Sequence, residues 1–158
     1  MLKIHESGMW FHLSEDKTFP IEKSDTYRKV NTRSVSTVEF ITMGPKQDII
    51  FVEAKTNAPD TENGEGIGEF VERIGKKFVH SLEVCYALLT KALPDAEPSF
   101  PDLLQAALKR GPAIKLILIV NRLSRAHCVN LQDALRLQLQ AEMRIWHMNI
   151  IVLNKEIG

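Results

Sequence analysis

Three charged residues interrupt two otherwise apolar segments of this chain. Residues 36–43 (STVEFITM) and 49–55 (IIFVEAK) are rich in strand-forming residues, and the turn-forming GPKQD separates them. In a hairpin centred on this turn, Glu39 lies across from Glu53, and the alternation of side chains puts Lys55 on the same face. The side chains expected on the opposite face are Phe40, Ile50, Val52 and Ala54.

Two opposed carboxylates inside an apolar hairpin must be neutralised by a proton, a cation or a basic side chain. Carboxylates suit Mg²⁺ or Mn²⁺, which polarises a phosphate and acidifies a bound water. We therefore expect Glu39 and Glu53 to bind the metal, with the Ala54 carbonyl as a further ligand. Lys55 would serve the attacking water and the charge of the transition state. This chemistry is metal-assisted phosphodiester hydrolysis.

The run VEFITMGPKQDIIFVEAK resembles the acid-then-(D/E)XK hairpin of the PD-(D/E)XK nuclease superfamily. Glu39 matches the first acid, Glu53 the second and Lys55 the lysine. The order of elements over residues 36–154 is also similar to that family's core. The resemblance implies an α/β, restriction-endonuclease-like fold with a mixed central β-sheet flanked by helices. It also implies a Mg²⁺-dependent endonuclease that acts on nucleic acid, DNA rather than RNA.

The chain departs from the family pattern in two respects. The family usually has Asp at the first acid, whereas Glu39 is longer by about one bond. The family core commonly begins with a helix that brings a further acid, whereas this chain begins with an extended segment. Glu6, Glu22 and Asp25 could each supply that acid, and the sequence does not choose among them.

The remaining pattern predicts one domain over residues 1–158. Extended runs are expected at Met1–Leu13 and Thr18–Glu22, and a loop or a short helix at 23–35. Apolar spacings of three and four predict a long helix from Gly66 to Ala92. We expect the later elements to be a helix at Asp102–Arg110, a buried strand at Ala113–Asn121, a helix capped by Asn130, and a buried strand at Met148–Asn154 parallel to the preceding one.

The positive charge is spread along the chain, whose formal net charge is zero. On the long helix, Arg73, Lys77 and Ser81 follow at a spacing of four, and we interpret this row as a solvated flank. The alternative is that Lys77 reaches over the sheet towards a phosphate. Three basic segments either line a nucleic-acid groove together or are scattered surface charge: Lys23–Arg33, Arg73–Lys77 and Lys109–Arg125.

Other classes of site find little support in the sequence. Cys85 and Cys128 lie far apart and are expected to be reduced core residues, and the five histidines lack the spacing of a zinc site. The N-terminus does not resemble a signal peptide, and no apolar run reaches the length of a membrane span. A cytoplasmic protein without a membrane partner is expected.

Two other functions remain open. The first is a binding or scaffold protein that keeps the nuclease-like fold without catalysis, in agreement with the zero net charge. The second is a different α/β enzyme whose acids act as general acid and base on a small phosphorylated molecule. The sequence is also compatible with a homodimer.

Overall fold

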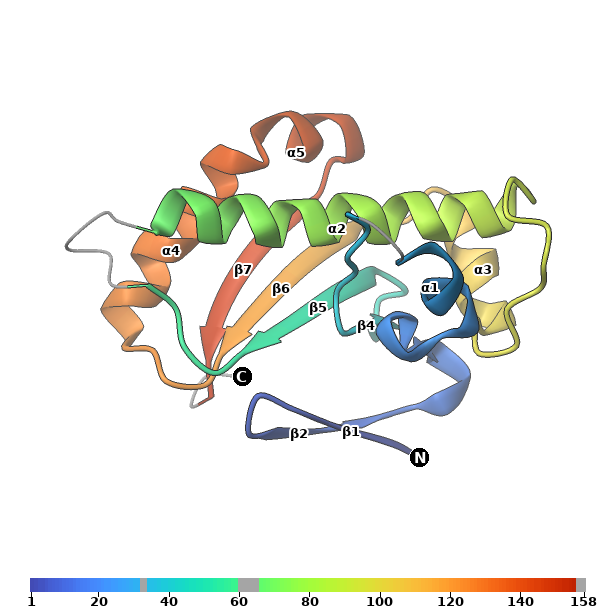
Figure 1. Ribbon diagram of the computed structural model, residues 1–158, viewed down its shortest axis with the longest axis horizontal. Coiled ribbons are helices and arrows are strands. Elements are labelled where there is room, and N and C mark those ends of the chain that lie inside the picture. Colours follow the sequence, from blue (N-terminus) through green and yellow to red (C-terminus); the bar gives the residue numbers. More distant parts are fainter. Residues whose placement is uncertain (32–33, 60–65, 156–158) are drawn as a thin grey trace.

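A five-stranded mixed sheet forms the centre of the computed structural model, which describes residues 1–31, 34–59 and 66–155 (Figure 1). The strand order is β3-β4-β5-β6-β7. The strands are Thr18–Phe19 (β3), Phe40–Met43 (β4), Ile49–Lys55 (β5), Ile114–Val120 (β6) and Asn149–Asn154 (β7). β3, β4 and β5 pair antiparallel, whereas β5, β6 and β7 pair parallel. The predicted mixed central sheet with flanking helices is confirmed, as is the parallel pair at the end of the chain.

The β4–β5 hairpin has the predicted centre. Phe40 pairs with Val52 and Met43 with Ile49, so the ladder is symmetric about Lys46. β4 is shorter than predicted, however, because it begins at Phe40 and not at residue 36. Glu39 therefore lies at a bend just before the strand, where it is not a regular ladder partner of β5.

The N-terminal segment is a hairpin of its own and not a single extended run. β1 (Leu2–Glu6) pairs antiparallel with β2 (Met9–Leu13). The two residues between them, Ser7 and Gly8, have φ angles of 52° and 77°, the left-handed values that a two-residue hairpin turn requires. The sequence prediction missed this turn because Ser-Gly interrupts the alternation for only two residues. Its consequence is that Glu6 lies at the end of β1.

Five helices lie among the described residues: α1 (Asp25–Val30), α2 (Ile67–Leu89), α3 (Asp102–Lys109), α4 (Arg125–Gln138) and α5 (Gln140–Trp146). Short 3₁₀ turns occur at Glu15–Lys17 and Ile21–Lys23, so the predicted extended run Thr18–Glu22 is a strand only over Thr18–Phe19. The predicted cap of the fourth helix was wrong. Ser124 Oγ, and not Asn130, accepts the cap hydrogen bond, from the His127 N–H at 3.3 Å.

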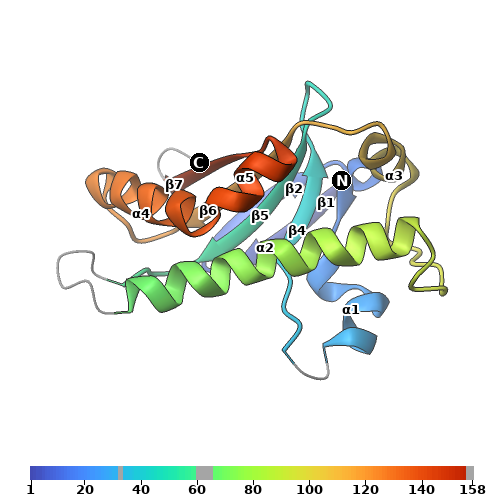
Figure 2. The same cartoon turned by 90° about the horizontal axis from the view of Figure 1, so that it is seen from above.

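Helices and the N-terminal hairpin cover opposite faces of the sheet (Figures 1 and 2). On the helical face, the fully buried Phe51 and Phe78 meet edge to face, with ring centroids 5.0 Å apart. Cys85 and Cys128 are buried in this core as free thiols, as expected. The other face forms a smaller core under β1 and β2, whose buried members are Ile4, Met9, Phe40, Val52, Ala54 and Ile119. β4 and β5 are therefore covered on both faces, as their apolar sequences predicted.

Side chains of α4 satisfy the backbone at the open edge of β7. Arg136 donates from Nε and Nη2 to the Ile150 carbonyl at 3.2 and 2.9 Å. The Val152 N–H donates to Gln132 Oε1 at 3.0 Å. These groups are consequently unavailable to a strand of another chain. Among the described helices, none has both the length and the apolar composition to cross a bilayer.

The Phe51–Phe78 contact yields a first prediction. Phe78→Ala should lower the free energy of unfolding by about 3–5 kcal/mol, because it removes a fully buried ring between the sheet and α2. Leu137→Ala is the control, because that side chain is 73% exposed and its loss should change stability by no more than about 0.5 kcal/mol. Urea denaturation measures both, and equal effects would contradict the packing described.

Candidate active site

Glu53 on β5 is an acid with no access to solvent. Its Oε2 lies 2.7 Å from Nζ of Lys77 on α2, which forms a buried ion pair between sheet and helix. Its Oε1 has no hydrogen-bond partner among the described residues. A buried carboxylate oxygen without a partner is energetically costly, so Oε1 is an atom that a ligand could satisfy.

Lys77 is not the solvated flank residue that we expected. Its side chain is 19% exposed. Burial lowers the pKa of Lys77, but the charge of Glu53, the hydrogen bond to it and the charges of Glu39 and Glu22 together outweigh this effect and hold that pKa above its ordinary value. Ser81, one turn further along α2, is also buried. Its hydroxyl donates to the Lys77 carbonyl at 2.7 Å and accepts from the Val38 N–H at 2.9 Å. Of the predicted row, only Arg73 is exposed.

The position of Lys77 could have been inferred from the helical pattern. It lies three residues after Ile74 and one before Phe78, both of which are buried against the sheet. A lysine at this edge of an apolar stripe can bury its aliphatic stem and bring its ammonium to a charge below. The sequence offered no single partner for that ammonium, and this is why the flank interpretation was preferred.

Glu39 is held beside Glu53 at the beginning of β4. It is 8% exposed, and its N–H donates to the Val52 carbonyl at 3.0 Å. Burial, a hydrogen bond with Glu22 and the charge of Glu53 raise the pKa of Glu39 to about 10. In the absence of a cation, Glu39 is therefore protonated at neutral pH.

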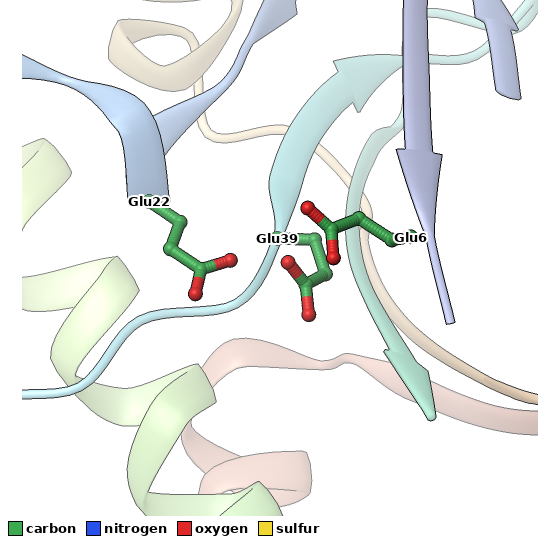
Figure 3. Close-up of side chains that lie close together, drawn as sticks. All are labelled: Glu6, Glu22 and Glu39. Atoms are coloured by element: carbon green, nitrogen blue, oxygen red, sulfur yellow. The ribbon is translucent and has the colours of Figure 1, made fainter. Parts of the chain in front are cut away.

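Two further acids meet Glu39 (Figure 3). The carboxylates of Glu6, Glu22 and Glu39 each offer an oxygen, and these oxygens lie within 4.8 Å of one another. Glu6 comes from the end of β1 and Glu22 from the 3₁₀ turn after β3. Of the three candidates for an additional acid, the structure thus brings in two. The third, Asp25, pairs with the exposed Arg28 at 3.2 Å.

The segment that carries Glu22 is anchored by a buried acid that the sequence did not reveal. Glu97 Oε1 accepts from the N–H and the hydroxyl of Thr26 at 2.8 and 2.9 Å. Its Oε2 accepts from the N–H and the hydroxyl of Ser99 at 3.1 and 2.7 Å. These bonds lower the pKa of Glu97 although its burial opposes the shift. Glu97 fixes the start of α1, three residues after Glu22, against the loop before α3.

The predicted lysine, Lys55, lies near the acids but is not the amine that contacts Glu53. Lys55 is half-buried at the end of β5, and the structure describes no ion pair between it and Glu53. It lines a cavity next to the acids, together with Lys77 and Arg73. Ala54 is 1% exposed, and its methyl group belongs to the core on the opposite face. The amine that contacts Glu53 is Lys77 instead.

The acids fit a hard divalent cation. Glu6, Glu22 and Glu39 supply carboxylate oxygens only, the ligand type that Mg²⁺ and Mn²⁺ prefer. Glu53 is outside this group of three, although its charge acts on Glu39. The geometry differs here from the expected Glu39–Glu53 pair, because Lys77 neutralises Glu53 while Glu6 and Glu22 join Glu39.

Comparison of the chain with family models, with curated proteins and with solved structures finds no match. The resemblance to the PD-(D/E)XK superfamily therefore depends on the residues of the hairpin.

The raised pKa of Glu39 predicts how stability depends on pH. This carboxyl ionises near 4.5 when exposed and near 10 in the folded, metal-free protein. Folding therefore favours its protonated form, and this contribution is present at low pH and is lost as the pH rises from about 5 towards 10. Urea denaturation in EDTA between pH 5 and 9 should show that the free energy of unfolding falls as the pH rises. Glu39→Gln should make this free energy less dependent on pH.

Glu72→Gln is the matched control, because Glu72 is an exposed glutamate on α2. It should leave this dependence on pH unchanged. A wild-type protein whose stability rises with pH over this range would contradict a protonated Glu39.

Proposed function

We propose that this chain is a metal-dependent, restriction-endonuclease-like nuclease domain that hydrolyses DNA phosphodiester bonds. The observation that supports it most directly is the pair of buried acids at the β4–β5 hairpin. Glu53 is inaccessible to solvent and Glu39 is 8% exposed, and each influences the other electrostatically. A structural role would not require two like charges in one interior position, since opposed carboxylates destabilise a sheet.

The residues suggest a division of roles. Glu39 would hold a Mg²⁺ or Mn²⁺ ion together with Glu6 and Glu22, and Glu53 and the Ala54 carbonyl would complete the ligands. When bound, such an ion polarises a phosphate and acidifies a water. Lys55 would stabilise the negative charge that develops on the phosphate.

Lys77 has a role that the hairpin motif does not include. It neutralises Glu53 at 2.7 Å and lines the same cavity as Lys55. The ion pair keeps the second carboxylate in place and compensates its charge in the absence of a cation. The side chain of Lys77 lines the cavity and would contribute to the binding of a phosphate there.

The same ion pair favours a second candidate function. Because Lys77 already neutralises Glu53, the fold does not require a cation at that carboxylate. A binding or scaffold protein that keeps the fold without catalysis would have this arrangement. The two candidates differ in metal binding, which can be measured directly.

If the acids hold a cation, Mn²⁺ should stabilise the folded protein. At a concentration 100 times the dissociation constant, one site adds about 2.7 kcal/mol to the free energy of unfolding. Isothermal calorimetry should detect binding, and thermal denaturation should show a higher midpoint with Mn²⁺ than with EDTA. Glu39→Gln should abolish both effects, whereas Glu72→Gln should preserve them. A wild-type protein without either effect would favour the scaffold.

Catalysis can be tested with supercoiled plasmid and Mn²⁺. Nicking or linearisation should fall on the order of 100-fold or more in Glu53→Ala and in Lys55→Ala, because Glu53 would help to hold the metal and Lys55 would stabilise the charge that develops on the phosphate. Lys46→Ala is the control for Lys55, since Lys46 is exposed in the hairpin turn. Cleavage that survives Glu53→Ala would refute the assignment. Hydrolysis of a phosphomonoester without cleavage of DNA would identify a different phosphate enzyme.

A further inference from the structure

A cavity of about 490 Å³ adjoins the acids at the end of β5. Its polar lining comes from Lys55, Asn57, Arg73 and Lys77, and none of its described lining residues is a carboxylate. Lys77 connects the two regions, because its ammonium contacts Glu53 while its side chain forms part of the cavity. A basic cavity thus lies directly beside an acidic cluster.

Two of the three cations in this cavity have no ion-pair partner among the described residues. The structure describes no ion pair for Lys55 or Arg73 among residues 1–31, 34–59 and 66–155. Much of the other basic charge singled out in the sequence is already paired: Lys23 with Glu6, Arg28 with Asp25, Lys29 with Asp95 and Lys115 with Asp48. Thr32 and Arg33 of the first basic segment lie outside the described residues. Lys55 and Arg73 thus bring two cations, neither with an ion pair to a described residue, to the lining of one cavity.

The position of the cavity in the fold also suits a ligand. Lys55 is the last residue of β5, which runs parallel to β6 and β7. In open α/β sheets, ligands bind outside the carboxyl ends of parallel strands. Arg73 and Lys77 approach from α2, on neighbouring turns of one helix face. Cations from a strand end and a helix thus converge on one space.

The second half of the lining is apolar. It comprises Ala58, Pro59, Phe70 and Ile74. A site for an inorganic anion alone needs neither this wall nor this volume, which lies in the range of about 300–1,000 Å³ found for organic ligands. A phosphate attached to a sugar and a base matches both halves, because its anionic part meets the cations and its carbon skeleton meets the apolar wall.

We propose that this cavity is a nucleotide subsite that holds the phosphate of one nucleotide unit. Arg73 and Lys55 bind the phosphate oxygens, with Lys77 shared between the phosphate and Glu53. The sugar lies against Ala58 and Pro59. The subsite deepens the proposed function. Its assignment to a nucleic-acid strand rests on that function, because a free nucleotide presents the same phosphate, sugar and base.

Binding is tested without metal, so that it is separate from catalysis. A fluorescein-labelled short oligothymidylate is titrated with the full chain in EDTA at low salt, and its fluorescence anisotropy is measured. Arg73→Gln should weaken binding about tenfold, because it removes a charged, bidentate contact to phosphate. Lys76→Gln is the matched control: it removes one charge from the same helix, at an exposed residue that does not line the cavity. Its effect should be less than twofold.

Two competitors identify the source of the phosphate. Thymidine monophosphate should displace the oligonucleotide and thymidine should not, and direct calorimetry with thymidine monophosphate shows whether a free nucleotide is sufficient. Binding of either phosphate-containing probe that depends on Arg73 supports the subsite. Equal losses in the Arg73 and Lys76 variants, or no binding of either probe, would overturn it.

The outcome is independent of the nuclease test. Cleavage of plasmid with Mn²⁺ but without a specific Arg73 effect on binding would remove the subsite and leave the nuclease. Binding that depends on Arg73, without cleavage of the plasmid, would support the subsite and remove the nuclease assignment. Since Arg73 is exposed, its variant should also keep the thermal midpoint of the wild type, so that a loss of binding is not a loss of folding.

Discussion

The buried ion pair between Glu53 and Lys77 is the constraint on which the rest of the site depends. A carboxylate without solvent access must be compensated, and the 2.7 Å contact to Nζ provides this compensation. The pair also fixes α2 over β5, because the lysine must reach the strand from one particular turn of the helix. Ser81, which follows Lys77 in the row, is buried one turn further along α2, where its hydroxyl donates to the Lys77 carbonyl and accepts from the Val38 N–H.

Lys77 pairs with Glu53 and Lys23 with Glu6, at 3.7 Å, but these two ammonium groups do not compensate all the acids that gather here. Glu6, Glu22 and Glu39 bring three further carboxyl groups to the edge of the hairpin (Figure 3). Without a cation, the system responds by protonating Glu39, whose pKa rises to about 10. A divalent ion, if it binds as proposed, would displace this proton, so that pH, metal binding and stability would be coupled at Glu39.

The hairpin was the most predictable part of the molecule. Its centre, the burial of β5 on both faces and the presence of Glu39 and Glu53 at one place followed from alternation and turn chemistry. The remaining site residues depend on contacts between distant segments. Glu6 and Glu22 come from the N-terminal strands, and their approach to Glu39 requires a two-residue turn and a 3₁₀ turn that local patterns signal weakly. The partner of Lys77 likewise could not be read from helix periodicity, which places a side chain on a face but names no acid beneath it.

The charge of the chain sums to zero, yet its signs are separated at the end of β5. Glu6, Glu22 and Glu39 form an acidic group, Lys55 and Arg73 line a basic cavity, and Lys77 lines that cavity while it contacts Glu53. Neighbouring opposite charges would ordinarily pair and neutralise one another, as Lys115 and Asp48 do on the same sheet. Lys55 and Arg73 have no ion pair with any described residue. In the proposed function, a cation would compensate the acids and a phosphate would compensate the bases, whereas either ligand alone would leave one set uncompensated.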